Sequence, residues 1–302
     1  MKALIELNDL HKSFRRTEAV SGLSLQVPEG QVTAFLGPNG AGKTTTLKCL
    51  LNLHRPDSGT ATVLGCDSRK LGPAQFMHIG YVSESMELPL WMTVDQFLNY
   101  CRPLYPQWDR AFEDKMRVQF DLPPKTKLRD LSRGMRMKAA LLSSLAYRPK
   151  LVVLDEPFSG LDPLVRDEFI RGLLELTEQE GWTVFISSHD IEEVQRLADR
   201  IAIINRGKLA LDESNESLQG RFRAVEVVFP DQEKPPAQVP ASWLHVEQAG
   251  RTLRFVETQF NNEDVLSATV KQTLFQDACH HAVPMSLREI FVALARAYRL
   301  AA

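Results

Sequence analysis

The feature that most constrains this sequence is a glycine-rich run between an apolar segment and a helix-forming segment. Residues 37–44 read Gly-Pro-Asn-Gly-Ala-Gly-Lys-Thr and fit the spacing GxxxxGK[ST]. The preceding residues 31–36 are mostly apolar and predict a short buried strand, and a helix is expected to begin at about Lys43. A strand that turns through glycines into a helix directs backbone N–H groups and the positive end of the helix dipole at one point. This arrangement suits a phosphate group and indicates an α/β fold.

The end of this run carries two side chains suited to nucleotide phosphates. The Lys43 ammonium can neutralise charge on the β- and γ-phosphates, and the Thr44 hydroxyl can bind Mg²⁺. The alternative is a glycine-rich turn that binds nothing, and the flanking strand and helix argue against it. The residues expected to surround the phosphates are Gly37, Pro38, Asn39, Gly40, Ala41, Gly42, Lys43 and Thr44.

A second motif is an apolar run, residues 151–154, that ends in the two carboxylates Asp155 and Glu156. Ligands of open parallel sheets bind at the carboxyl ends of the strands. We therefore expect Asp155 to hold Mg²⁺ through water, and Glu156 to reach the water that attacks the γ-phosphate. An apolar run followed by acidic residues is a weak signal alone, and it gains weight from the phosphate loop upstream.

Apolar runs alternate with helix-type segments through roughly the first 220 residues, which predicts a buried parallel sheet. Residues 88–150 lack a clear strand and are expected to form a helical subdomain, in which Thr93 and Gln96 have capping-box spacing. The strands expected in the large sheet are residues 31–36, 151–154, 183–187 and 200–204, and those of a smaller sheet are residues 3–7, 23–27 and 61–64.

The character of the sequence changes after residue 220. We expect two domains, residues 1–220 and a small α+β accessory domain over residues 221–302. The accessory domain shows no recognisable site, so regulation and a docking or dimer-stabilising role both stay open. Its expected elements are strands at residues 224–229 and 253–256, helices at residues 265–275 and 287–298, and a proline-rich loop at residues 230–240.

Composition disfavours several classes of protein. The net charge is only −2, so electrostatics gives no case for nucleic acid as the main partner. Four scattered cysteines without CxxC spacing argue against a disulfide framework or structural zinc, and Cys279-His280-His281 alone supplies too few zinc ligands. No apolar run approaches the ~20 residues that span a bilayer, and the N-terminus lacks the apolar core of a signal peptide. At a membrane, another chain would have to supply the spanning part.

Three shorter motifs lie downstream of the phosphate loop. Residues 131–135 read LSRGM, residues 159–162 read SGLD, and residues 187–190 read SSHD. Along the chain the order is the phosphate loop, LSRGM, the acidic strand, SGLD and SSHD. This set resembles the ATP-binding cassette (ABC) family over roughly residues 4–220. LSRGM stands where the family usually has the signature LSGGQ. The resemblance implies a P-loop NTPase cassette that hydrolyses ATP with Mg²⁺. Its expected parts are a RecA-like parallel-sheet core, an antiparallel β subdomain and a helical subdomain.

The resemblance also implies roles for individual residues. Phe14 matches the aromatic residue that stacks on adenine, with a strand core residue as the alternative. Thr45 matches the residue that touches the α-phosphate. His189 matches the histidine that contacts the γ-phosphate and helps to position the reacting water, which makes it a catalytic candidate together with Glu156.

Further matches concern partners. Ser132 and Gly134 open a helix and, in the family, face the nucleotide held by a second cassette; Asp162 belongs to the segment called the D-loop. The chain carries one intact phosphate loop and one intact signature segment, and this favours a homodimer in which each subunit supplies both. The family also implies an integral membrane permease as partner, and a location at the cytoplasmic face of a bacterial cell membrane.

Two positions depart from the family pattern. Glu84 stands where the Q-loop glutamine is usual, and a carboxylate there could meet Mg²⁺ or the attacking water; the alternative is a solvated loop glutamate. In the signature, Arg133 and Met135 replace the usual Gly and Gln. Arg133 is expected to add a cation near the partner's ATP, and Met135 cannot hydrogen-bond as glutamine does.

The departures resemble a subgroup. Residues 105–109 (YPQWD) with LSRGM look like bacterial ABC-2-type exporter ATPases, some of them linked to envelope-active antibiotics, and residues 284–291 resemble the last helix of drug-export ATPases. This favours an exporter subunit. An importer ATPase is the alternative within transport, although sugar-type importers carry longer, β-rich C-terminal domains. A soluble ABC ATPase acting on ribosomes or DNA is disfavoured by the single phosphate loop and the lack of basic excess.

Overall fold

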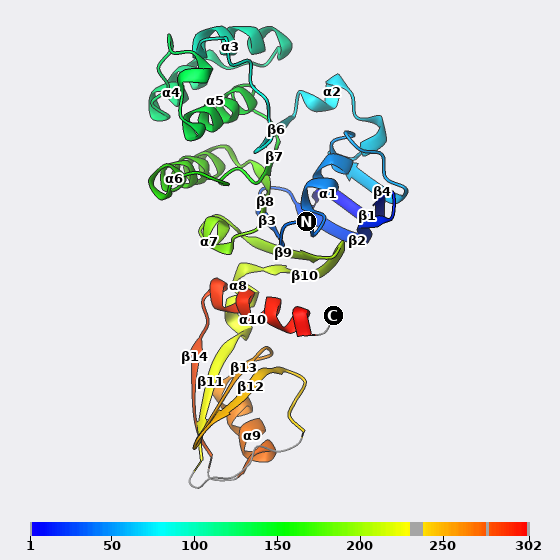
Figure 1. Ribbon diagram of the computed structural model, residues 1–302, viewed down its shortest axis with the longest axis vertical. Coiled ribbons are helices and arrows are strands. Elements are labelled where there is room, and N and C mark those ends of the chain that lie inside the picture. The colour runs from blue at the N-terminus through cyan, green and yellow to red at the C-terminus, as the bar shows by residue number, and fades with distance from the viewer. Residues whose placement is uncertain (1, 230–237, 276–277, 301–302) are drawn as a thin grey trace. The chain divides into compact units, whose positions relative to one another are not determined.

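The computed structural model describes residues 2–229, 238–275 and 278–300 (Figure 1). The chain divides into two compact units, Met1–Asp212 and Glu213–Ala302, whereas the sequence was expected to divide after residue 220. The earlier division follows from α8 (Asn215–Arg221), which contacts α10 (Leu287–Leu300) within the second unit.

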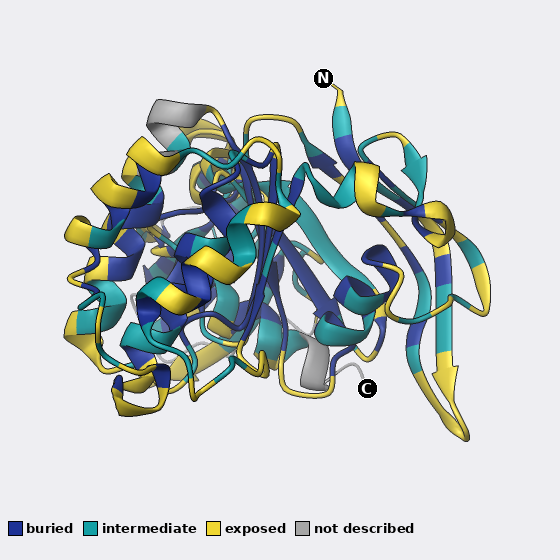
Figure 2. Cartoon of the chain, turned by 90° about the horizontal axis from the view of Figure 1, so that it is seen from above, coloured by how far each residue is buried: buried dark blue, intermediate teal, exposed yellow. Residues whose placement is uncertain are grey.

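The first unit is built on a six-stranded sheet. In order across the sheet, its strands are β10 (Lys208–Ser214), β9 (Arg200–Asn205), β3 (Val32–Leu36), β8 (Thr183–Ser188), β7 (Leu151–Asp155) and β6 (Ile79–Ser83). The five strands from β9 to β6 pair in parallel. Figure 2 shows strands in the middle of this sheet buried along most of their length, as expected for parallel strands with both faces covered.

Four of these strands were predicted, and two were missed. The run of β6 is interrupted by Gly80, and a Cβ there would lie 2.7 Å from the carbonyl oxygen of Ser144, so the glycine serves close helix packing. The edge strand β10 is only half-buried and shows no apolar run. It joins β9 through Arg206 and Gly207, whose φ values of 49° and 78° suit a two-residue hairpin turn.

Helices cover both faces of this sheet. Figure 1 shows α6 and α7 on one side of the strands, and α1 with a smaller sheet on the other. The smaller sheet is antiparallel in the order β2-β1-β4-β5, and its buried side chains join those of α1 in one cluster. The elements are α1 (Lys43–Leu50), α2 (Pro73–Phe76), α6 (Pro163–Glu180), α7 (Ile191–Val194), β1 (Ala3–Phe14), β2 (Thr17–Pro28), β4 (Ser58–Val63) and β5 (Cys66–Asp67).

Residues 88–150 are helical, as predicted. The Thr93–Gln96 capping box is present: the Gln96 N–H donates to Thr93 Oγ1 at 3.2 Å, and the Thr93 N–H donates to Gln96 Oε1 at 2.9 Å. The α-helices here are α3 (Val94–Cys101), α4 (Arg110–Gln119) and α5 (Arg133–Leu145), with short 3-10 turns at Arg102–Leu104 and Leu128–Asp130. A further 3-10 turn, Ser68–Lys70, lies before α2.

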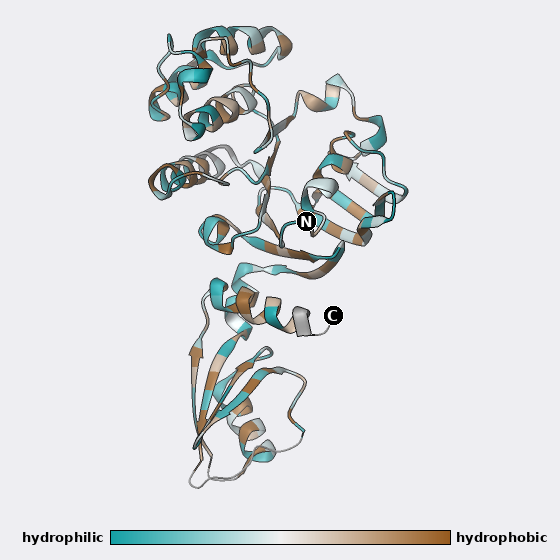
Figure 3. Cartoon of the chain, viewed as in Figure 1, coloured by the Kyte–Doolittle hydropathy of each residue, from teal (hydrophilic) through white to brown (hydrophobic). Residues whose placement is uncertain are grey.

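The second unit is a four-stranded antiparallel sheet with helices. Its strand order is β12 (Trp243–Ala249), β13 (Thr252–Glu257), β11 (Arg223–Val228), β14 (Cys279–Pro284). Buried residues of the sheet pack against α9 (Glu263–Thr273), and Figure 3 shows the corresponding bands of hydrophobic and hydrophilic residues along the strands. The sequence predicted β11, β13 and the two long helices but missed β12 and β14.

Two expectations for the second unit concern short segments. Cys279-His280-His281 lies in β14, where His280 Nε2 lies 3.3 Å from the Glu263 carboxylate. In the described ranges no cluster of three or more His, Cys, Asp or Glu side chains could hold a metal. Residues 230–237 of the expected proline-rich loop lie outside the described residues.

Candidate nucleotide site

The loop between β3 and α1 has the backbone that its glycines predict. Gly40 and Gly42 have φ values of 81° and 111°, in the region that favours glycine. A Cβ on Gly42 would lie 2.3 Å from the carbonyl oxygen of Ala19 in β2, so an alanine there would push the loop away. The first N–H groups of α1 have no acceptor within the helix, and with the helix dipole they favour an anion.

The Lys43 side chain is buried and folds back over the loop. Its Nζ donates to the carbonyl oxygens of Gly37 at 2.6 Å and Pro38 at 3.3 Å, and lies 3.0 Å from Glu156 Oε1. A buried ammonium needs such partners because desolvation of an unpaired charge is costly. Phosphate oxygens would compete with these oxygens for the same donor.

The predicted metal ligands Thr44 and Asp155 lie together. Asp155 Oδ1 accepts hydrogen bonds from Thr44 Oγ1 at 3.1 Å and from Ser187 Oγ at 2.6 Å. Burial raises the pKa of the Asp155 carboxyl, while the two hydroxyl hydrogen bonds act in the opposite direction. A cation beside this carboxylate would favour its charged form.

A hydroxyl and a carboxylate fit Mg²⁺, which takes one or two protein ligands and completes its shell with water and substrate phosphates. Thr44 and Asp155 would hold the ion in this site. When bound, it would neutralise negative charge on the nucleotide phosphates.

Glu156 follows β7 in an unusual backbone conformation. Its φ is 51°, a left-handed value that is uncommon for a residue other than glycine and is often found at functional sites. Two hydrogen bonds hold it: its N–H donates to the carbonyl oxygen of Ser187 at 3.2 Å and to Ser187 Oγ at 3.1 Å. Ser187 therefore contacts both residues of the acidic pair, a role that the sequence did not reveal.

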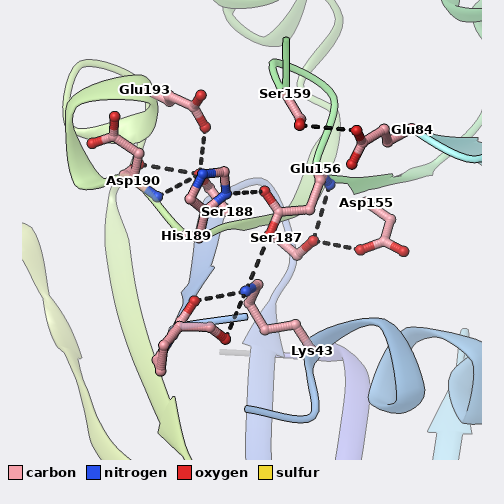
Figure 4. A network of polar contacts seen from close by, with 12 residues as sticks. Lys43, Glu84, Asp155, Glu156, Ser159, Ser187, Ser188, His189, Asp190 and Glu193 are labelled. Atoms are coloured by element: carbon pink, nitrogen blue, oxygen red, sulfur yellow. Dashed lines mark hydrogen bonds and ion pairs between the residues drawn. The ribbon is translucent and has the colours of Figure 1, made fainter. Parts of the chain in front are cut away.

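The Glu156 carboxylate lies between the Lys43 ammonium and the His189 imidazole. Oε1 faces Lys43, and Oε2 lies 2.7 Å from His189 Nδ1 at the end of β8 (Figure 4). The hydrogen bond to Glu156 raises the pKa of His189, and burial opposes this shift. A carboxylate fixed in this way can orient a water molecule and accept its proton.

The signature and D-loop candidates cap helices of their own chain. Ser132 Oγ accepts from the Met135 N–H at 3.2 Å at the start of α5, and Asp162 Oδ1 accepts from the Val165 N–H at 3.0 Å at the start of α6. A Cβ on Gly134 would lie 2.5 Å from Val165 Cγ1, so this glycine lets α5 and α6 approach. Within the described ranges, no hydrogen bond or ion pair joins Ser132 or Asp162 to the phosphate loop.

In the part of the chain that the structure describes, the Glu84 side chain contacts Arg133 and Ser159, and not the predicted metal ligands Thr44 and Asp155. Its Oε1 accepts hydrogen bonds from Arg133 Nη2 at 2.5 Å and Ser159 Oγ at 2.9 Å. Only its backbone reaches the acidic strand, because its N–H donates to the carbonyl oxygen of Asp155 at 2.9 Å. The metal and catalytic roles of Glu84 stay predictions. The sequence does not predict the contact to Arg133, although both residues depart from the family pattern.

Two nucleotide candidates remain: Thr45 directly follows the phosphate loop in sequence, and Phe14 lies at the end of a strand of the small sheet. Phe14 ends β1 with 42% of its surface exposed, so it is no core residue. Its ring meets His54 edge-on at 5.2 Å between centroids. Thr45 is half-buried in the first turn of α1.

Residues 20–159 match the ABC transporter family. The uncharacterized ABC transporter ATP-binding protein YcbN of Bacillus subtilis (strain 168) is 31% identical over 238 residues, covering 77% of this chain and 76% of YcbN. This chain belongs to the ABC transporter family. Like other ATP-binding subunits of that family, this ABC ATPase binds and hydrolyses ATP.

Other relatives of this ABC ATPase differ in named function. The probable multidrug ABC transporter ATP-binding protein YbhF of Escherichia coli (strain K12) is 33% identical over 247 residues, covering 80% of this chain and 42% of YbhF. The sulfate/thiosulfate import ATP-binding protein CysA of Salmonella typhi is 34% identical over 214 residues, covering 68% of this chain and 58% of CysA. The relatives therefore leave the direction of transport undecided.

The fold agrees with solved cassettes. The dimeric structure of MJ0796, a bacterial ABC transporter cassette, superposes with a TM-score of 0.63 at 23% identity, covering 70% of this chain and 98% of MJ0796. The predicted P-loop cassette fold, with its parallel core sheet and antiparallel sheet, is confirmed.

Proposed function

We propose that this chain is the ATPase subunit of an exporter that acts at the cytoplasmic face of a bacterial membrane. It pairs head-to-tail with a second copy and docks on a separate membrane-spanning subunit. Among the residues that the structure describes, no helix is long and apolar enough to cross a bilayer. A second protein is therefore the proposed source of the transport path.

The observation that carries the docking proposal is an apolar groove of about 470 Å³ in the first unit. Aliphatic and aromatic side chains from the end of α1, the loop after β6 and α3 line it. Leu53, Tyr100 and Leu104 at this groove are 56%, 61% and 59% exposed. Exposed apolar side chains around a groove mark a binding surface, and an apolar helix face is a common occupant.

We propose the following roles in the site. Glu156 and His189 orient the attacking water, Thr44 and Asp155 hold Mg²⁺, and Glu84 acts near them. The nucleotide lies on the loop 37–44 with Thr45 and Phe14, and Ser132, Gly134 and Asp162 face the nucleotide of the second copy. The position of Glu156 between Lys43 and His189 supports this assignment.

Export is favoured over import by two similarities. LSRGM and residues 105–109 resemble ABC-2-type exporter ATPases, and YbhF is named a probable multidrug protein. Import is the second candidate, because CysA is similar at a comparable level of identity.

The groove is tested by binding to solubilised bacterial membranes. Tagged wild-type chain is expected to co-purify with a multi-span membrane protein, and Tyr100→Glu and Leu104→Glu should reduce this at least several-fold. Val118→Asp, at a 76% exposed site on α4, is the matched control and should bind normally. Equal binding of all variants would contradict docking at the groove.

The direction is tested in proteoliposomes that carry the co-purified complex with its cassettes outside. ATP added outside should drive an exporter to accumulate substrate in the lumen. Depletion of substrate from the lumen would instead establish an importer.

A further inference from the structure

We infer that Glu84 and Arg133 form a latch within one subunit, which holds the signature segment against its own Q-loop and D-loop and opens when ATP brings two subunits together. The opening step rests on the proposed pairing of two cassettes. The contact itself is a feature of the single chain.

The latch connects three segments that are distant in sequence. Glu84 follows β6, Arg133 begins α5, and Ser159 lies in the loop before α6. One carboxylate oxygen, Glu84 Oε1, accepts from both Arg133 Nη2 at 2.5 Å and Ser159 Oγ at 2.9 Å. Figure 4 shows the Glu84 and Ser159 side chains directed toward each other.

The D-loop leaves room for the arginine. Gly160 has a φ of 68°, and a Cβ there would lie 2.4 Å from Arg133 Nη1 and 2.8 Å from Arg133 Cζ. The guanidinium therefore lies directly over this glycine. A side chain at position 160 would displace it, so the D-loop backbone is fitted to the latched position of Arg133.

The charges explain why the two departures occur together. A carboxylate at position 84 adds negative charge on the strand-end side where Asp155 and Glu156 already lie, and Arg133 neutralises it. The two side chains are 41% and 47% exposed, so water screens the pair and its contribution to folding is small. A weak pair that joins segments distant in sequence is suited to switching, because it can open at low cost.

Opening the latch would change both halves of the proposed composite site. Ser132 and Gly134 adjoin Arg133, so a signature segment that turns to the partner's nucleotide carries the guanidinium with it. Release also leaves the Glu84 carboxylate without its cation, with the Ser159 hydroxyl as its remaining partner. Each subunit therefore has to break its Glu84–Arg133 contact when two subunits associate, and this lowers the net free energy gained on dimerisation.

The contact is tested in the nucleotide-free protein by amide hydrogen exchange of residues 157–162. Glu84→Gln and Arg133→Met should each speed exchange by about two- to five-fold, the range of an exposed ion pair, and the double variant should add nothing further. The reversed pair Glu84→Arg with Arg133→Glu should restore slow exchange. Arg129→Met, at a 61% exposed arginine in the same region, is the control and should leave exchange unchanged. Additive effects of the two single variants would overturn the latch.

The opening step is tested by ATP-driven dimerisation in a Glu156→Gln background, followed by light scattering. Removing the latch with Glu84→Gln should lower the ATP concentration at the midpoint by about two- to five-fold. In an Arg133→Met background the same change should have no effect, because the latch is already absent. An equal shift in both backgrounds would mean that the Glu84 charge acts directly on the phosphates, and would overturn the opening step. If no variant dimerises with ATP, the proposed pairing fails, while hydrogen exchange still decides the contact.

Discussion

His189 Nδ1 lies 2.7 Å from Glu156 Oε2, and this contact joins the ends of two neighbouring parallel strands, β7 and β8. The other carboxylate oxygen of Glu156 faces Lys43 at 3.0 Å. The proposed catalytic carboxylate is therefore held from two sides, by the Lys43 ammonium and by the His189 imidazole, and each contact can be tested separately.

Glu156→Gln should retain ATP binding and lose most ATP hydrolysis. The amide keeps the shape of the side chain but cannot accept a proton, so turnover should fall by about 10²–10⁴-fold. Binding rests mainly on the backbone of residues 37–44 and should persist. Steady-state phosphate release and equilibrium nucleotide titration measure the two quantities. Turnover near that of the wild type would contradict the catalytic role of Glu156.

The same substitution should lower the pKa of His189. This pKa is raised above its usual 6.5 chiefly by the hydrogen bond to Glu156. The stability from the pair is therefore complete below the pKa of the unfolded histidine, and is lost as pH rises through the higher folded value. Histidine Cε1 proton titration by NMR, assigned with His189→Gln, measures the shift. An unchanged His189 titration in Glu156→Gln would show that the carboxylate does not set it.

Lys43→Ala should weaken nucleotide binding itself. The ammonium neutralises phosphate charge in the ground state, and its loss also leaves the buried Glu156 carboxylate without its cation. Titration with a fluorescent ATP analogue should show the loss, whereas Lys48→Ala on the same helix should bind like the wild type. Unaltered affinity in Lys43→Ala would show that the loop does not hold phosphate as argued.

Two inactive variants should restore activity when mixed. Lys43→Ala disables the phosphate loop, and Ser132→Asp keeps a helix-capping oxygen at α5 while placing a negative charge toward the partner's phosphates. With random pairing, about half of the dimers are mixed and carry one intact site, so up to roughly a quarter of the wild-type rate should return.

Differently tagged subunits confirm that mixed pairs form in this experiment. Mixed pairs without activity would indicate strictly coupled sites or catalysis within one chain. Full activity of Ser132→Asp alone would exclude the composite site.

Gly134→Ala should destabilise the first unit. The added Cβ would lie 2.5 Å from Val165 Cγ1, and such overpacking costs about 1–3 kcal/mol. Val165→Ala removes the clashing methyl, so the double variant should be more stable than Gly134→Ala alone. Urea unfolding of the two single variants and the double variant measures this. If Gly134→Ala destabilised the wild type and the Val165→Ala variant equally, the strain would not come from the contact with Val165.

The sequence was most informative where local chemistry determines structure. The loop 37–44, the strands β3 and β7, and the Thr93–Gln96 cap depend on neighbouring residues, and all were predicted. The contact of Thr44 with Asp155 was also expected, because the phosphate-loop motif assigns Thr44 to Mg²⁺ and Asp155 ends a parallel strand where such ligands bind.

Contacts between distant segments were less predictable. The partner of Arg133 was expected to be a nucleotide on another subunit, and the structure pairs it with Glu84 of the same chain. Nothing in the spacing of positions 84 and 133 brings them together, because their approach depends on how α5 packs beside β6. Ser187 likewise belongs to the SSHD motif, and only the structure shows that its hydroxyl connects Asp155 to the Glu156 backbone.

The folded-back Lys43 has a consequence for thermodynamic measurements. Its ammonium makes hydrogen bonds to two loop carbonyl oxygens and an ion pair with Glu156, so a phosphate that takes this ammonium must replace oxygen partners of the chain itself. Binding therefore exchanges one set of oxygen partners for another, and a calorimeter records only the difference between the two sets. A small binding enthalpy would thus be compatible with strong individual contacts to phosphate.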